Sequence, residues 1–84
     1  MRVSTVEDRV LEISSEHFGV LKSQITRDTS LENDLGADSL DRVELQMKYE
    51  DDFDLSISDE DFDKIQTVGQ CVQYIERRLQ GLDE

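Results

Sequence analysis

The chain has 84 residues, and its 21 acidic residues outnumber 9 basic ones to give a formal net charge of −12. A chain this short buries roughly 60–65% of its unfolded surface, which supports one small core but excludes a deep, enclosed active site. We therefore expect a single domain over residues 1–84. The negative charge argues against binding to nucleic acid or anionic membranes. It favours a monomer and predicts partners with basic patches.

No apolar run approaches the roughly 20 residues that a membrane span requires, and Met1–Thr5 shows no apolar signal region. The one cysteine, Cys71, cannot form an internal disulfide, so the fold does not depend on an oxidising compartment. These features predict a soluble cytoplasmic protein without membrane insertion.

The apolar residues recur at helical rather than alternating spacing. A first helix is expected from about Val3, with Val6, Val10 and Ile13 on one stripe, and Gly19 marks its end. Residues 20–38 lack a clear period, and we expect a long loop there with a turn of helix. A loop of this length in a small domain is often functional.

A second helix is predicted over Ser39–Phe53, with Asp38 as its N-cap. A short helix is expected from Ser58 to about Ile65, and a last helix over residues 67–79. Strand signals are almost absent. The predicted fold class is all-α, a small bundle of three longer helices and one short helix.

The second predicted helix carries two apolar stripes on roughly opposite faces. At about 100° per residue, the stripes consist of Leu45, Tyr49 and Phe53 on one side and of Leu40, Val43 and Met47 on the other. A surface helix normally needs one such stripe to face the core. The second stripe is therefore either buried against another element or exposed as a contact surface. The acids beside it suit a basic, hydrophobic partner groove, but the spacing leaves both alternatives open.

The motif that points to a function is Asp34–Asp41, which reads Asp-Leu-Gly-Ala-Asp-Ser-Leu-Asp. It resembles the acyl carrier protein family, and closely the discrete carriers of bacterial-type fatty acid synthesis. Later segments match at family spacing, so the resemblance covers about Val6–Leu79. An eight-residue match inside a matching frame is strong evidence, whereas Asp38-Ser39 alone is an ordinary helix start.

The resemblance implies that Ser39 is the attachment site of 4′-phosphopantetheine, which a phosphopantetheinyl transferase moves from coenzyme A. Gly36, Asp38 and Leu40 flank the serine, and Gly36 would let the transferase approach closely. The attached phosphodiester would lie near the positive end of the helix dipole. The family is not catalytic: the arm holds growing acyl chains as thioesters and delivers them to fatty acid synthesis enzymes and acyltransferases. No metal is required.

The resemblance also implies a partner surface and an acyl pocket. The partner positions are Asp38, Leu40, Asp41, Val43, Glu44, Met47, Glu50 and Asp51, which makes the Leu40 stripe the outward one. The pocket positions, between which a growing chain folds back, are Gln46, Tyr49, Ile57, Phe62, Ile65 and Cys71. Gln46 and Phe62 depart from the aliphatic and small residues usual there. We expect them to narrow or polarise the pocket and to weaken sequestration of long chains. Arg42 and Lys48 add positive charge to an otherwise acidic helix.

Other functions remain open. One alternative is a carrier for a specialised polyketide, aminoacyl or modified-lipid pathway, and another is an acidic adaptor whose serine is unmodified. His17 and Cys71 are interpreted as packing residues, because His17 has no histidine or cysteine partner at metal-ligand spacing. The acids after residue 51 lack the glycine and the terminal glutamate of a calcium-binding loop.

Overall fold

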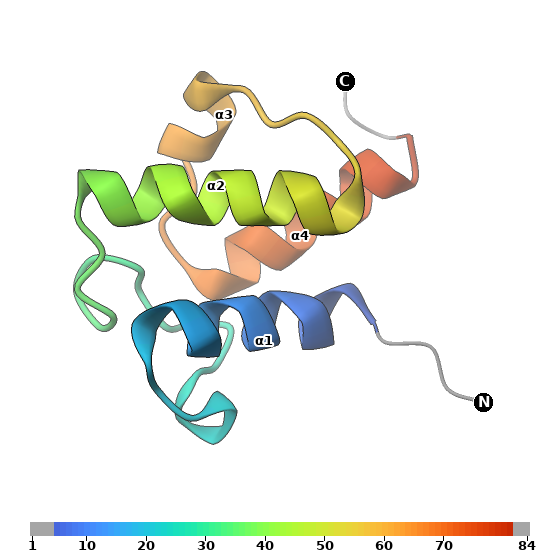
Figure 1. The fold of residues 1–84 in the computed structure, drawn as a ribbon. Helices are drawn as coiled ribbons and strands as arrows, with labels where there is room; N and C mark the ends of the chain where they lie inside the picture. Colours follow the sequence, from blue (N-terminus) through green and yellow to red (C-terminus); the bar gives the residue numbers. More distant parts are fainter. Residues whose placement is uncertain (1–4, 82–84) are drawn as a thin grey trace.

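The computed structural model describes residues 5–81 and shows an all-α bundle (Figure 1). Its elements are α1 (Val6–Phe18), the 3-10 turn η1 (Lys22–Gln24), α2 (Ser39–Phe53), α3 (Asp59–Asp63) and α4 (Val68–Leu79). Three longer helices and one short helix confirm the predicted fold class. Val3, which was expected to start the first helix, lies outside the described residues. Within residues 5–81, none of the helices is long and apolar enough to cross a membrane.

The helices begin where short polar side chains cap them. The caps of the four α-helices are Thr5, Asp38, Ser58 and Thr67, and each accepts a hydrogen bond from the backbone N–H three residues further on. The first helix ends at Gly19, which adopts a left-handed φ of 69°. The third helix is shorter than predicted. Ser58 is its N-cap rather than its first residue, and the helix ends at Asp63 with Lys64 as its C-cap.

The core lies where α1 packs against both α2 and α4. Among residues 5–81, its buried hydrophobic residues are Val10, Ile13, Ile25, Leu31, Ala37, Leu45, Tyr49, Ile57, Phe62, Ile65, Val68, Cys71, Val72 and Ile75. The buried Tyr49 hydroxyl shares a 3.1 Å hydrogen bond with Ser14, which removes the cost of burying both polar groups. Burial raises the pKa of Tyr49 well above its ordinary value.

The connection between α1 and α2 is long, but it is tied to the start of α4. Leu31 N–H donates to the Gln66 carbonyl at 2.9 Å, and Val68 N–H donates to the Thr29 carbonyl at 3.0 Å. Leu31 is fully buried, and its carbonyl accepts from Ala37 N–H at 2.8 Å. These bonds hold residues 29–37 against the bundle and so set the position at which α2 begins (Figure 1).

Candidate attachment site and recognition surface

Ser39 is the first residue of α2, and its side chain is exposed. A reciprocal capping box stands around it: Asp41 N–H donates to Asp38 Oδ1 at 2.9 Å, and Asp38 N–H donates to Asp41 Oδ2 at 3.2 Å. Gly36, three residues earlier, has a φ of 72°, a conformation that side chains with a Cβ rarely adopt. The glycine is therefore needed for the turn itself, in addition to the close approach expected from the sequence.

Two grooves meet at Ser39. The first has a volume of about 460 Å³ and is lined by Ser30, Glu32, Asn33, Ser39, Arg42, Asp63 and Gln66. The second, between α2 and α3, has a volume of about 310 Å³ and is lined by Ser39, Arg42, Val43, Gln46, Asp59, Phe62 and Asp63. A flexible group attached to the serine hydroxyl would therefore have room in either groove.

The residues at this position fit a phosphodiester. The N–H groups of the first helical turn have no partner inside the helix, and the Asp38 carboxylate occupies only that of Asp41. The N–H groups of Ser39 and Leu40 therefore remain to face an anion, with the helix dipole behind them. The chain's one histidine does not serve Ser39 as a base, since its two ring nitrogens face Asp41 and Lys48. An external enzyme would have to activate the hydroxyl.

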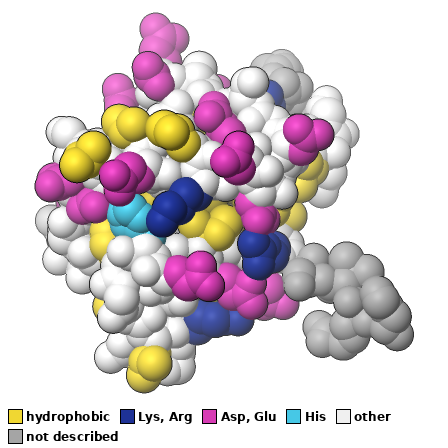
Figure 2. Space-filling view, in the orientation of Figure 1, with side chains coloured by type: hydrophobic (Ala, Val, Ile, Leu, Met, Phe, Trp, Pro, Cys, Tyr) yellow, Lys and Arg dark blue, Asp and Glu magenta, His cyan; other side chains and the backbone are white. Residues whose placement is uncertain are grey.

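The second apolar stripe of α2 is exposed. Leu40, Val43 and Met47 are 64%, 52% and 57% accessible, whereas Leu45 and Tyr49 on the opposite face are fully buried. Figure 2 shows hydrophobic side chains gathered over α2 with acidic side chains around them. The stripe is free for contact rather than buried in the bundle, as the family resemblance implied and the spacing alone left open.

The acids predicted to edge this stripe divide into two groups. Asp38, Glu44 and Asp51 are exposed. Asp41 and Glu50 are only half-exposed, and both accept hydrogen bonds within the chain: Asp41 from His17, and Glu50 from Ile57 N–H at 2.7 Å. Glu50 therefore anchors the loop after α2, a role that its spacing in the sequence does not reveal.

Five of the six predicted pocket positions lie together in the core. Tyr49, Ile57, Phe62, Ile65 and Cys71 are all buried, and the Tyr49 and Phe62 rings are 6.2 Å apart. Burial raises the pKa of the Cys71 thiol to about 12, so the thiol stays protonated and unreactive at neutral pH.

The sixth pocket position, Gln46, lies at the edge of the core and joins α2 to the start of α3. Its amide donates to the Ile57 carbonyl at 2.8 Å and to Asp59 Oδ1 at 3.0 Å. Arg42, one helical turn earlier, does the same at the end of α3: its guanidinium donates to the Phe62 and Ile65 carbonyls at 2.8 and 2.6 Å. We call this pair, Arg42 and Gln46, the α3 clamp.

The clamp could not be identified from the sequence, which shows only a cation and an amide four residues apart on a helix. The guanidinium of Arg42 also lies 5.4 Å from the centre of the Phe62 ring. Arg42 is thus a contact of the groove beside Ser39 and not simply a positive charge on an acidic helix.

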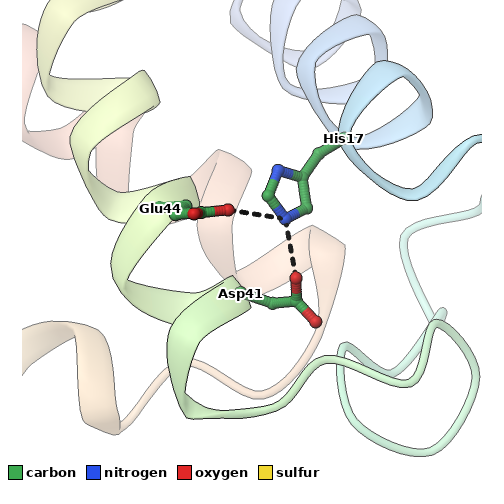
Figure 3. A group of neighbouring side chains, drawn as sticks. All are labelled: His17, Asp41 and Glu44. Carbon is green, nitrogen blue, oxygen red and sulfur yellow. Dashed lines mark hydrogen bonds and ion pairs between the residues drawn. The ribbon is translucent and has the colours of Figure 1, made fainter.

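His17 also has partners that its spacing in the sequence did not indicate. Its side chain is 6% exposed, and Nε2 lies 2.9 Å from Asp41 Oδ1 and 3.7 Å from Glu44 Oε1 (Figure 3). Lys48 Nζ lies 3.0 Å from Nδ1. The hydrogen bond with His17 lowers the pKa of Asp41 below its ordinary value. These partners come from a different helix, so only the packing of α1 on α2 brings them together.

The geometry agrees with the comparisons to known proteins. A family model described as a phosphopantetheine attachment site matches residues 8–75. Acyl carrier proteins from two strains of Porphyromonas gingivalis are 46% identical over 77 residues, which cover 92% of this chain and 99% of theirs. The chain belongs to the acyl carrier protein family. Its cofactor is 4′-phosphopantetheine, whose thiol carries acyl groups as thioesters.

Solved structures of acyl carrier proteins share the fold. A putative acyl carrier protein from Mycobacterium tuberculosis aligns with a TM-score of 0.79 at 30% identity, over 86% of this chain and 96% of that one. The acyl carrier protein from Enterococcus faecalis aligns with a TM-score of 0.73 at 43% identity, over 83% and 89% of the two chains. This acyl carrier protein therefore has the helical arrangement of its relatives.

Proposed function

We propose that Ser39 is the residue that carries the arm and that this single-domain protein serves fatty acid biosynthesis in the cytoplasm. The observation that carries the proposal is the position of Ser39, exposed at the start of α2, inside the Asp34–Asp41 motif and between two grooves. A phosphopantetheinyl transferase would form a bond from Ser39 Oγ to the phosphate of the arm. The nucleotide part of coenzyme A would leave, and a base of the transferase would take the hydroxyl proton.

The partner surface is proposed to be the exposed stripe and the acids around it. Leu40, Val43 and Met47 would enter apolar depressions of partner enzymes, and the neighbouring carboxylates would pair with basic side chains. Contacts of this kind are weak and sensitive to salt, as required of a monomeric carrier that must leave one enzyme for the next. Glu50 contributes less to this surface than its neighbours, because Ile57 N–H already occupies one of its oxygens.

We propose that contacts between α2 and α3 hinder the entry of an acyl chain into the acyl pocket of this protein. A chain attached at Ser39 would have to pass between α2 and α3 to reach the buried pocket residues, and the α3 clamp joins these helices at both ends of α3. The bulk of Phe62 fills the same region. Long acyl chains should therefore be sequestered weakly. This restricted entrance is also the observation that favours the second candidate, a carrier for shorter or more polar cargo in a specialised pathway.

The attachment site is tested by incubating the purified chain with coenzyme A and a broad-specificity transferase and measuring the intact mass. We expect a single addition of the arm that is absent from Ser39→Ala. A Ser30→Ala variant is the matched control, since Ser30 lines the same groove and should leave the addition unchanged. An unmodified chain would point to the acidic adaptor, and an addition that survives in Ser39→Ala would exclude Ser39. Native isolation of the loaded form identifies the cargo and so separates the two pathways.

A further inference from the structure

The carrier function gives no role to His17, the chain's one histidine, yet it points from α1 towards two carboxylates of α2 (Figure 3). His17, Asp41 and Glu44 each offer one ligand atom, and these atoms lie within 4.8 Å of one another. In a tetrahedral zinc site with bonds of about 2.0–2.1 Å, two ligand atoms are about 3.3 Å apart. The observed distances from Nε2, 2.9 Å to Asp41 and 3.7 Å to Glu44, bracket that value.

We propose that His17, Asp41 and Glu44 form a binding site for a divalent transition-metal ion of the zinc class, with water completing the coordination. The imidazole nitrogen selects the ion, because calcium and magnesium take oxygen ligands whereas zinc and cobalt readily accept imidazole. The histidine also distinguishes the site from the many carboxylate pairs on this acidic surface. An ion bound there would neutralise two carboxylates of the proposed partner surface.

Two of the three ligands are held in place by the fold. The His17 side chain is 94% buried and packs edge-on against the Phe18 ring, 4.9 Å between centroids, so its orientation is set. Asp41 faces His17 with Oδ1, while its other oxygen accepts from Asp38 N–H in the capping box. Support of this kind from the surroundings orients ligands before the ion arrives. Glu44 is exposed and can move the short distance that coordination requires.

The contact between Lys48 and His17 works against binding of the ion, because it must be lost when the ion binds. Its ammonium donates to Nδ1 of His17 at 3.0 Å, so the ring hydrogen lies on Nε2 and points to Asp41. When an ion binds Nε2, that hydrogen moves to Nδ1, where it would face the ammonium. The ring keeps one hydrogen throughout. The exposed Lys48 side chain must therefore turn away, and its removal should raise the affinity for the ion.

The experiment uses the full-length, untagged chain before attachment of the arm, since the arm's thiol would itself bind zinc. Cys71 is buried and does not compete. Binding of Zn²⁺ is measured by calorimetry in physiological salt with excess Mg²⁺, and binding of Co²⁺ by its visible absorption and by the shift of the one histidine's imidazole NMR signals. We expect one ion per chain bound through the imidazole.

Matched variants separate this site from diffuse attraction by the acidic surface. His17→Gln and Asp41→Asn should each weaken binding at least tenfold, whereas Asp51→Asn, with the same change of charge on the same helix, should change it less than twofold. Lys48→Gln should strengthen binding severalfold, and Lys64→Gln should not. Circular dichroism checks that each variant is folded.

The proposal would be overturned by any of three results: unmoved imidazole signals on Co²⁺ addition, undiminished affinity in His17→Gln, or equal affinity of Asp41→Asn and Asp51→Asn. Because the measurements use the chain before the arm is attached, they are independent of whether Ser39 is the attachment residue.

Discussion

At the scale of single residues, the backbone turn before Ser39 determines how its side chain is presented. A serine beside an aspartate cap occurs at many helix starts. Here Gly36 turns the chain through a left-handed conformation, and Ala37 then anchors the turn by donating to the Leu31 carbonyl at 2.8 Å. The serine consequently emerges on an exposed first turn with two grooves beside it.

Replacement of Gly36 by alanine should strain this turn. A Cβ on Gly36 would meet no heavy atom within 4 Å, so the cost comes from the positive φ alone. A left-handed conformation costs a residue other than glycine about 1–2 kcal/mol. We expect Gly36→Ala to lower the free energy of unfolding in urea by about that amount and to slow modification at Ser39.

Asparagine at position 36 provides the control, since it tolerates the left-handed region better than alanine. Gly36→Asn should recover part of the lost stability. Equal stability of the alanine variant and the original chain would contradict the strain argument.

At the scale of the helices, α3 depends on its neighbours. It has five residues, too few to be stable by its own hydrogen bonds. The α3 clamp supplies partners at both of its ends, and the Tyr74 hydroxyl of α4 donates to Asp61 at 2.8 Å. The seam between α2 and α3 is therefore held by polar side chains as well as by the buried Phe62.

Release of the α3 clamp should make long acyl chains easier to sequester. In Arg42→Ala, the Ile65 carbonyl loses its donor and the Phe62 carbonyl keeps only the Ile65 N–H, which should cost about 1–3 kcal/mol of stability in the unloaded protein. Loading with a long acyl chain should then raise the melting temperature more than it does in the original chain, and Gln46→Leu should act in the same direction. Short chains should give little change in either protein.

Arg77→Ala is the matched control for the clamp, because Arg77 is exposed on α4 and does not line the groove between α2 and α3. A stabilisation that rises equally with chain length in the original protein and in Arg42→Ala would contradict the role assigned to the clamp.

The contact between α1 and α2 includes an ion pair with a pH dependence. Arg9 Nε donates to Asp52 Oδ2 at 2.9 Å, and this bond lowers the pKa of Asp52 below its ordinary value of 3.8. Since the folded-state pKa is depressed, the pair stabilises the protein above about pH 4. That contribution is lost as the pH falls through the folded-state pKa.

We expect Asp52→Asn to remove this acid-sensitive part of the stability. Measured by urea unfolding between pH 5 and pH 2, the free energy of unfolding should fall less steeply in Asp52→Asn than in the original chain. The exposed Asp63, which forms no ion pair within residues 5–81, provides the comparison through Asp63→Asn. Parallel pH profiles for Asp52→Asn and the original chain would argue against the assignment.

The whole molecule is small in comparison with the distance over which its charges interact at low salt. Its radius of gyration is 12.0 Å and its formal net charge is −12. The Debye length falls from about 30 Å at 0.01 M salt to about 8 Å at 0.15 M. At low salt the acids therefore repel one another across the entire fold, whereas at physiological salt only near neighbours interact strongly.

Salt should have opposite effects on stability and on partner binding. The urea midpoint of the isolated protein should rise as sodium chloride increases from 0.01 to 0.3 M, because screening weakens the repulsion within the fold. Affinity for a basic partner such as the transferase should fall over the same range. A urea midpoint that falls with salt would show that favourable ion pairs outweigh the repulsion.

The sequence by itself determined the local structure and the family. Helical spacing, capping residues and Gly19 act within a few residues of the chain, so the four helices could be predicted to within one or two residues at most ends. The Asp34–Asp41 motif is contiguous, and together with the matching segments around it, it identified a carrier and predicted its attachment residue.

Only the tertiary structure showed what holds α3 in place and which residues surround His17. It also showed which face of α2 is exposed, which the spacing left open and the family resemblance implied. Each of these depends on contacts between residues far apart in the chain. The spacing on one helix cannot show which of two apolar stripes finds a neighbour, and nothing in the order of residues indicates that α1 places an imidazole over Asp41 and Glu44. The environment of Ser39 depends on both the sequence and the tertiary structure: the motif can be read in the sequence, whereas the grooves are formed by packing.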